Sequence, residues 1–268
     1  MNLPENFVFT QQNLQDFSDC RFRFLLKYIH KTEWPAIETE PVMLQEARME
    51  LGQQFHRLVQ QYFAGMDPGL LDSTIQSPEL ADWWHVFIQM KLVDLPGEKY
   101  AEKMLSIPFE EHRVLAKYDL LIDHGAGNFT IYDWKTSQYQ PTRQKLFQRL
   151  QSIVYPFVLT MSLSEPPPDT SKFLNIEMIY WYPSFPETPI QFTYTSEKFS
   201  EDKEFLSGLI QQVTSLREEQ FEKTSDLKKC NYCRYRSLCD RGISAGTLSS
   251  DMESQPDEGL FDLDFDSF

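Results

Sequence analysis

The chain has 268 residues, of which 41% are hydrophobic and 14% are aromatic, which is ample for the core of one large domain. No stretch approaches the roughly 18 uninterrupted apolar residues that a membrane span requires, so we expect a soluble, cytoplasmic protein without a membrane partner. The formal net charge of −15 argues against a polyanionic ligand. However, seven of the acids lie in residues 251–268, which contain no lysine or arginine. Without these seven negative charges, the net charge of the rest of the chain is −15 + 7 = −8.

The N-terminal part of the chain is predicted to be helical. Thr10 is a suitable N-cap for a helix that continues through an apolar-rich stretch to Tyr28. Pro41 begins a long helix that ends near Ala64, in which apolar residues recur mostly at steps of three and four. A third helix covers about residues 79–92, where tryptophan and phenylalanine supply apolar surface.

Strands follow in the middle of the chain. Sequence pattern predicts three of them, at residues 102–108, 112–123 and 128–134. The last two are separated by the turn-rich segment 124–128, so we expect a meander.

Helix returns from about Thr142 to Met161, and Pro156 should kink it because proline removes a helical hydrogen bond. The remaining predicted elements are strands at residues 173–182 and 189–195 and a helix at residues 197–222. This alternation predicts an α/β fold with a mixed central sheet flanked by helices. We assign residues 1–243 to this domain and predict that residues 244–268 form an acidic, disordered tail.

The triplet Asp133-Trp134-Lys135 ends the third predicted strand. Residues two apart on a strand face the same side, so the carboxylate and the ammonium share one cavity while Trp134 is buried on the opposite face. Asp119 on the preceding strand can meet Asp133 across the hairpin. Phosphodiester hydrolysis requires a divalent cation, carboxylates that hold it and a group that positions water. A D-x-K triplet alone recurs by chance, but its context here favours such a site.

Two further positions add to that context. Gln151 and Tyr155 stand at i and i+4, on one face of the helix that follows the triplet. His56 lies on the helix that begins at Pro41, and a lone histidine on an apolar helical face is more often a core residue than a metal ligand. Gly52, one turn earlier, permits a close approach of the helix to the sheet. This spacing favours the prediction that His56 is a metal ligand.

The cysteines are few and unevenly placed. Three form a C-x2-C-x5-C run and the fourth lies near the N-terminus, at Cys230, Cys233, Cys239 and Cys20. Three cysteines within ten residues are unusual for a disulfide framework, so we expect reduced thiols in one metal site closed by both ends of the chain. Four thiolates suit tetrahedral zinc as readily as iron and sulfide, and spacing alone does not separate the two.

Basic residues gather beside these motifs. They occur without an acid at residues 20–32 and again at residues 134–151, and a third group surrounds the cysteine run. For any one block, a solvated surface is a sufficient explanation. Three blocks beside three motifs favour a basic channel that follows the phosphates of a nucleic acid.

In order and spacing, these residues resemble the PD-(D/E)XK phosphodiesterases, and within them the RecB-like branch that includes the AddB nuclease domain and the CRISPR-associated RecB-like exonucleases. The resemblance extends from about Thr10 to Gly242. Its elements are Cys20-Arg21-Phe22-Arg23-Phe24, Gly52-x3-His56, a strand acid at Glu102, Asp119, Asp133-Trp134-Lys135-Thr136-Ser137, Gln151-x3-Tyr155 and the cysteine run. One departure is Arg21, which stands where proline is common in the family.

The resemblance implies a role for each matching residue. The implied ligands of Mg²⁺ or Mn²⁺ are His56, Asp119, Asp133 and the main-chain carbonyl of Trp134. Lys135 would orient or activate water, and Glu102 would be a further catalytic acid, with Glu110 and Glu111 as nearby alternatives. The predicted DNA contacts are Gln151, Tyr155, Thr136, Ser137, Arg143 and Arg149. On the four cysteines the resemblance implies a [4Fe-4S] cluster, preferred here over zinc, as a structural clasp.

The sequence therefore predicts a metal-dependent DNA nuclease, acting as an exonuclease on single strands or duplex ends in repair, recombination or CRISPR-type processing. No G-x4-G-K-[ST] loop is present, so the chain has no helicase motor of its own. One alternative is a nucleic-acid-binding module that keeps the fold without catalysis, and another is a zinc-stapled structural protein. The tail is predicted to be a docking peptide for a protein partner or a DNA mimic.

Overall fold

The computed structural model describes residues 3–33, 40–163, 174–231 and 233–242, so the predicted acidic tail lies outside the described residues. The described strands are β1 (Val8–Thr10), β2 (Glu98–Phe109), β3 (His112–Gly125), β4 (Asn128–Trp134), β5 (Asn175–Trp181) and β6 (Ile190–Tyr194). The described α-helices are α1 (Gln11–Asp19), α2 (Arg21–Phe24), α3 (Glu40–Phe63), α4 (Pro68–Asp72), α5 (Pro78–Gln89), α6 (Arg143–Phe147), α7 (Leu150–Ser162) and α8 (Ser196–Ser215). Shorter helical turns of other types lie at Leu25–Ile29, Leu92–Asp94, Glu218–Gln220 and Leu227–Cys230.

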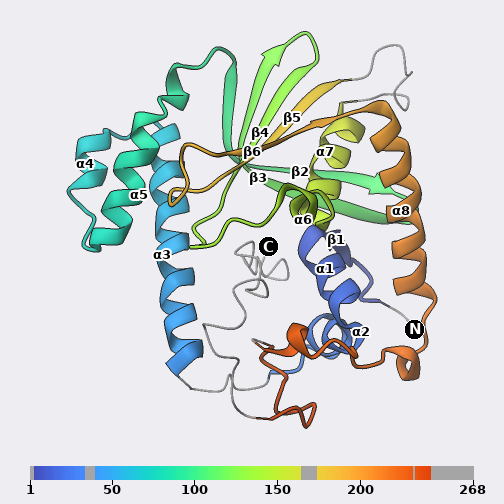
Figure 1. The fold of residues 1–268 in the computed structure, drawn as a ribbon. Helices are drawn as coiled ribbons and strands as arrows, with labels where there is room; N and C mark the ends of the chain where they lie inside the picture. The colour runs from blue at the N-terminus through green and yellow to red at the C-terminus, as the bar shows by residue number, and fades with distance from the viewer. Residues whose placement is uncertain (1–2, 34–39, 164–173, 232, 243–268) are drawn as a thin grey trace.

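The predicted meander forms three consecutive strands of the sheet, with β2 paired only to β3. β2, β3 and β4 pair antiparallel in succession, with Leu120 of β3 opposite both Ala101 of β2 and Tyr132 of β4. β5 then pairs parallel with β4, and β6 pairs antiparallel with β5. The sheet is therefore mixed, with helices on both of its faces, as the alternation of elements predicted (Figure 1).

One edge of β3 is shared by two strands. β1 pairs in parallel with residues 113–115, and β4 pairs with residues 120–125. Asp119 lies in the interval between them, where neither β1 nor β4 continues the ladder. The sequence did not predict β1, because three residues are too few for a recognisable alternation.

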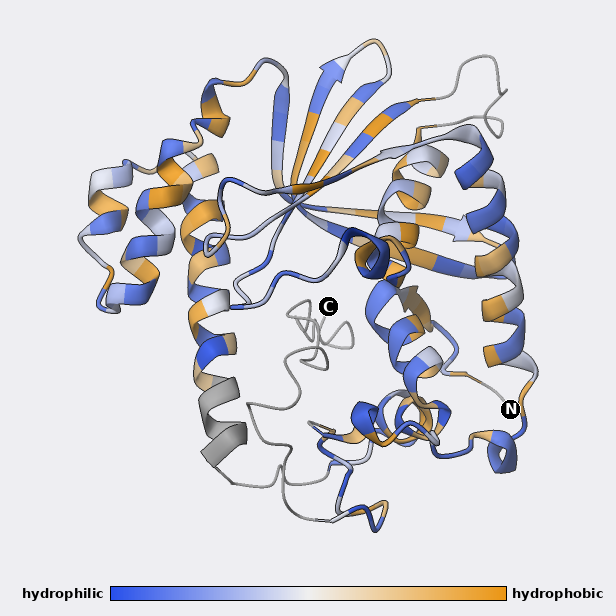
Figure 2. Ribbon diagram, in the orientation of Figure 1, coloured by the Kyte–Doolittle hydropathy of each residue, from blue (hydrophilic) through white to orange (hydrophobic). Residues whose placement is uncertain are grey.

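Side chains alternate between two hydrophobic cores, one on each face of the sheet. Leu121 and Ile131 belong to the core shared with α1, α7 and α8, whereas Leu120 and Trp134 belong to the core shared with α3 and α5. Figure 2 shows hydrophobic residues alternating along the strands and hydrophilic turns on α1 and α8. Trp134 is 1% exposed, so it is buried away from the side chains that flank it in sequence, as predicted.

The segment predicted as one kinked helix at residues 142–161 forms two helices. The break begins at Gln148, whereas Pro156 lies inside α7. The hydroxyl of Ser152 donates to the carbonyl of Leu146 at 2.6 Å, which satisfies a carbonyl near the end of α6. The break is therefore stabilised by a side chain from the next helix, and the kink at Pro156, inside α7, stays a prediction.

The first predicted helix is also interrupted. Thr10 caps α1 as expected, and it also forms a capping box with Asn13. The helix ends at Cys20, whose backbone is extended (φ −161°, ψ 106°), and α2 and a π-helical turn follow. Next to this extended residue, the amide of Phe22 donates to the carbonyl of Glu222 at 3.1 Å. The N-terminal helices are thus joined to the C-terminal segment.

α4 was not predicted, and the other helices differ from prediction at their ends. α5 ends at Gln89 and a short 3-10 turn takes the place of its predicted last turn. α8 ends at Ser215 and not at residue 222, because Leu216 adopts an extended backbone (φ −67°, ψ 142°). In the described ranges, none of the helices has both the length and the apolar character needed to cross a membrane.

Candidate metal centre

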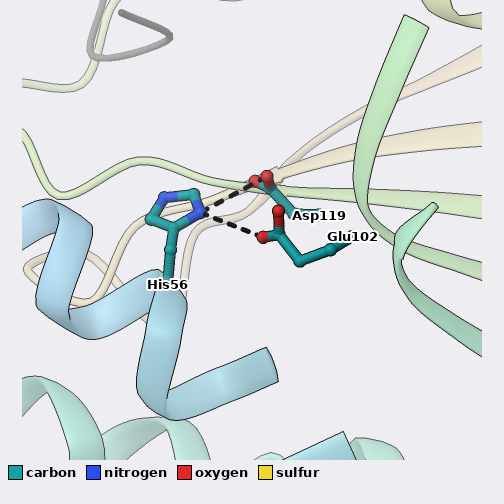
Figure 3. A group of neighbouring side chains, drawn as sticks. All are labelled: His56, Glu102 and Asp119. Atoms are coloured by element: carbon teal, nitrogen blue, oxygen red, sulfur yellow. Dashed lines mark ion pairs between the residues drawn. The ribbon is translucent and has the colours of Figure 1, made fainter. Parts of the chain in front are cut away.

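Three ionisable side chains from three elements converge on one point (Figure 3). His56 of α3, Glu102 of β2 and Asp119 of β3 offer ligand atoms that all lie within 4.8 Å of one another. Nδ1 of His56 is 3.3 Å from Oδ1 of Asp119 and 4.0 Å from Oε1 of Glu102. One imidazole nitrogen and two carboxylate oxygens are donors that suit a divalent cation.

Gly52 allows α3 to approach the sheet at this point. A Cβ at Gly52 would lie 2.6 Å from Oγ1 of Thr136, the residue that follows Lys135. Because glycine has no side chain, the helix can lie directly against this segment, and His56 follows one turn later on the same face. The close approach expected from the spacing of Gly52 and His56 is therefore present.

Glu102 has an unusual backbone. Its φ of 53° lies in the left-handed region, and the ladder between β2 and β3 is interrupted where Glu102 faces Asp119. For a residue with a Cβ this conformation costs on the order of 1–2 kcal/mol. Lys117 forms an ion pair with Oε2 of Glu102, while Oε1 faces His56. Burial and the charge of Asp119 raise the pKa of Glu102.

The side chain of Asp119 on β3 binds the backbone of β4, at a position where the two strands do not pair through their backbones. Its Oδ2 accepts a hydrogen bond from the amide of Trp134 at 2.8 Å, and its Oδ1 faces His56. Burial opposes ionisation of this carboxyl, but the charges of His56 and Lys135 outweigh burial and lower its pKa. Asp119 is therefore a carboxylate with one oxygen directed at the cluster.

Asp133 and Lys135 lie next to this group and contact each other. Nζ of Lys135 is 2.8 Å from Oδ1 of Asp133, and the side-chain amide of Gln151 donates to Oδ2. Burial, only partly offset by Lys135, raises the pKa of Asp133 to about 7. Within the described residues, Oδ1 of Asp133 is buried and receives no hydrogen bond of good geometry, so a lone pair is available to a cation.

His56 lies among carboxylates, and its role as a metal ligand stays a prediction. Burial by itself would lower its pKa, but the carboxylates of Asp119, Glu102 and Asp133 outweigh burial and raise the pKa above 6.5. An imidazolium at this position neutralises the acids when no cation is bound. A divalent cation would displace that proton and take over the same role.

Gln151 and Tyr155 lie beside Asp133, and both are buried. Gln151 is 3% exposed and Tyr155 is 5% exposed, with the Tyr155 ring 5.2 Å from that of Tyr118. Burial and the charge of Asp133 raise the pKa of Tyr155 well above 10, so the phenol stays neutral. The structure brings both residues to the site, and their contact with a DNA strand stays a prediction.

The other predicted DNA contacts are spread over the loop and helix that follow β4. Thr136 is buried against α3, whereas the hydroxyl of Ser137 is held by a carbonyl within its own loop. Arg143 is exposed on α6 and its Nε donates to the carbonyl of Gln191 at 3.2 Å. Arg149 is half-buried at the N-cap of α7. The contact of these four side chains with DNA stays a prediction.

The two ends of the chain meet near the cysteines. Nζ of Lys229 is 2.8 Å from Oδ1 of Asp19, and burial together with the charges of Cys230 and Cys20 raises the pKa of the Cys233 thiol. Among the described residues, however, no three cysteine sulfurs lie within 4.8 Å of one another. The structure therefore brings the two ends together but does not show a cysteine cluster.

Sequence reasoning missed Lys117. It lies two residues before Asp119, so both side chains share one face of β3, and it neutralises the second oxygen of Glu102. The same period of two that paired Asp133 with Lys135 could have identified it.

The sequence profile described as the PD-(D/E)XK nuclease superfamily matches residues 8–240. The chain belongs to the PD-(D/E)XK nuclease superfamily. A crystal structure of a "Putative exonuclease" from Eubacterium rectale is similar in fold, with a TM-score of 0.54, 12% sequence identity and coverage of 91% of this chain and 92% of that one. The crystal structure of SSO0001 is less similar, with a TM-score of 0.43, 13% identity and coverage of 89% and 88%. None of the curated protein sequences matches the chain.

Membership of the PD-(D/E)XK superfamily explains the arrangement of the sheet and the acids. The mixed central sheet flanked by helices is consistent with a restriction-endonuclease-like core. The superfamily consists of nucleases, so the chain is a hydrolase that acts on nucleic acid. Its enzymes typically use divalent metals, and the group of His56, Glu102 and Asp119 is the candidate metal site.

Proposed function

We propose that this PD-(D/E)XK protein is a DNA nuclease that uses Mg²⁺ or Mn²⁺ to hydrolyse phosphodiester bonds. The observation that carries the proposal is the convergence of His56, Glu102 and Asp119 within 4.8 Å, next to the contact of 2.8 Å between Asp133 and Lys135. A cation site beside a lysine that can position water is the equipment that this reaction needs.

The donor atoms fit either ion. Three carboxylates are hard oxygen ligands of the kind that both ions prefer, and the imidazole of His56 favours Mn²⁺ slightly more than Mg²⁺. The residues proposed to hold the cation are His56, Asp119, Asp133 and the carbonyl of Trp134, with Glu102 as a further acid. When bound, the cation would polarise the phosphoryl oxygen and neutralise developing negative charge.

The protein groups have separate tasks in this proposal. Lys135 places a positive charge beside Oδ1 of Asp133, where it can orient water toward a phosphorus atom and stabilise the charge that forms. Gln151 holds the other oxygen of Asp133, which fixes the orientation of that carboxylate. Lys117 does the same for Glu102.

The proposed substrates are single strands or duplex ends of DNA, with a role in repair, recombination or CRISPR-type processing. Support for DNA comes from residues 134–151, which contain four basic residues and no acid and connect β4 to α7. Support for an exonuclease comes from the name of the Eubacterium rectale protein of similar fold.

The test compares labelled single-stranded and duplex DNA, each with Mg²⁺, Mn²⁺ or EDTA. Asp133→Ala and Lys135→Ala should abolish cleavage and retain DNA binding, because they remove reacting groups and leave the fold. Asp123→Ala is the matched control, since it removes an acid from β3 beyond the cluster, and it should cleave normally. Wild-type protein that binds DNA but cleaves nothing with either ion would instead favour the alternative, a binding module without catalysis.

For the cysteines we propose a structural [4Fe-4S] cluster on Cys20, Cys230, Cys233 and Cys239. The meeting of the two chain ends supports it, and so does the guanidinium of Arg241, which donates to Sγ of Cys230 at 3.2 Å and would offset thiolate charge. Anaerobic purification followed by iron, acid-labile sulfide and zinc analysis tests the proposal. Zinc without iron would support a zinc staple.

The acidic tail, residues 251–268, is proposed to occupy the basic channel as a DNA mimic or to dock on a protein partner. Deletion of the tail should raise DNA affinity by more than the loss of its seven charges explains, even at high salt. An affinity that is unchanged at high salt would rule out the mimic.

A further inference from the structure

Tyr180 lies beside the proposed reaction centre, and no role has been given to it above. It stands on β5 directly opposite Asp133 in the parallel pairing of β4 and β5. Its side chain is fully buried, and Nζ of Lys135 lies 5.8 Å from the centre of its ring. Lys135 therefore has two partners on adjacent strands, a carboxylate and the face of an aromatic ring.

A chain of hydrogen bonds fixes the Tyr180 ring. The hydroxyl of Ser152 donates its only proton to the carbonyl of Leu146 at 2.6 Å. Ser152 must therefore act as acceptor toward the Tyr180 hydroxyl, which lies 2.8 Å away. Phe192 of β6 meets the same ring in a T-shaped contact at 5.9 Å. The ring is thus held at its hydroxyl and by its neighbour on the sheet.

One turn of α7 holds both partners of Lys135. Gln151 donates to Asp133, and the next residue, Ser152, accepts from Tyr180. A lysine ammonium is a point charge on a flexible four-carbon stem, so its position depends on the contacts around it. A carboxylate alone fixes the distance to one atom, whereas the ring restricts the direction from which the ammonium approaches.

We propose that Tyr180 is a positioning residue that holds the ammonium of Lys135 in place for the reaction, with Ser152 fixing the tyrosine. This inference rests on the proposed nuclease function. Tyr180 carries no charge and is not one of the proposed cation ligands. Its loss should therefore reduce the rate of the chemical step and leave cation affinity unchanged.

The experiment uses Tyr180→Leu, which removes the ring, and Tyr180→Phe, which removes only the hydroxyl. Phe157→Leu is the matched control, because Phe157 is another fully buried aromatic residue that packs against Phe109 and Phe199 and not against Lys135. The measurements are kcat and KM on labelled DNA, and Mn²⁺ affinity by calorimetry, which needs no turnover.

Tyr180→Leu should lower kcat on the order of tenfold, from the loss of a desolvated cation–π contact, with KM and Mn²⁺ affinity within about twofold of wild type. Tyr180→Phe and Ser152→Ala should each lower kcat by about two- to fourfold. The double variant should lose no more kcat than Ser152→Ala alone, because Ser152→Ala already breaks the hydrogen bond that Tyr180→Phe removes.

Two results would overturn the inference alone. One is a Tyr180→Leu enzyme whose kcat falls no further than that of Phe157→Leu, which would make Tyr180 an ordinary core residue. The other is a loss of Mn²⁺ affinity as large as the loss of kcat, which would place the effect on the cation ligands. Wild-type protein without cleavage would overturn the proposed function and this inference together.

Discussion

Gly52 allows a direct test of how α3 is held against the strand that carries Asp133 and Lys135. In Gly52→Ala the new Cβ lies 2.6 Å from Oγ1 of Thr136, far inside contact distance, whereas Cβ of Thr136 is at an ordinary 3.8 Å. The interfering atom is therefore one hydroxyl oxygen, which a second substitution can remove.

Two effects oppose each other in this substitution. Overpacking a buried site costs about 1–3 kcal/mol, and alanine in place of glycine stabilises a helix by about 0.8–1 kcal/mol. We expect Gly52→Ala to lower the free energy of unfolding by about 0–2 kcal/mol in the wild type. In a Thr136→Ala background the oxygen is absent, so the same substitution should raise the free energy of unfolding by up to about 1 kcal/mol.

Urea unfolding of the four proteins in this double-mutant cycle, all in EDTA, measures the difference. Cleavage rates should follow the same pattern, because Thr136 directly follows Lys135 and any displacement of it moves the ammonium. Equal effects of Gly52→Ala in the two backgrounds would refute the reasoning, and so would a Gly52→Ala protein more stable than wild type.

Three further predictions concern single residues. The free energy of unfolding of Glu102→Gly, measured with urea, should be about 1 kcal/mol higher than that of Glu102→Ala, because glycine accepts the φ of 53° without strain. Equal stabilities would show that no strain is stored there. Thr10→Ala should lower the free energy of unfolding by about 1 kcal/mol through loss of the α1 cap, and an unchanged urea midpoint would contradict this. In EDTA the raised pKa of His56 means that the folded state binds its proton more tightly, so this stabilisation is full below pH 6.5 and is lost as pH rises through the folded-state pKa. The stability difference between wild type and His56→Gln should therefore shrink as pH rises above 6.5, and a difference that grows would contradict the assignment.

Patterns that repeat along the sequence were sufficient to predict most of the long helices and strands. The meander follows from alternation, because Val114, Ala116 and Tyr118 of β3 lie in one core and Phe129 and Ile131 of β4 lie in the same core. The same period predicted that Asp133 and Lys135 share a side, and they lie 2.8 Å apart. The spacing of Gly52 and His56 predicted a close approach of α3, and the contact with Thr136 is that approach.

Features that depend on distant partners could not be predicted in this way. The break between α6 and α7 is stabilised by the Ser152 hydroxyl, and the interruption at Cys20 accompanies a backbone hydrogen bond from Phe22 to Glu222. The left-handed backbone of Glu102 is found opposite Asp119, in a strand that sequence pattern describes as regular. In the first case the partner lies on the next helix, and in the other two it lies far away in the chain, so the pattern within one element does not reveal it.

The contact between Asp19 and Lys229 spans 210 residues of sequence, and this separation determines when the N-terminal helices can find their partner. During synthesis at about 5–20 residues per second, α1 and α2 emerge on the order of 10–40 s before the segment that they meet. Their polar surface suits that interval, since Arg23 pairs with both Asp16 and Asp19, and Lys27 also pairs with Asp16, all within the N-terminal segment. A segment translated near the end of this domain therefore completes the packing of helices that were made near its start.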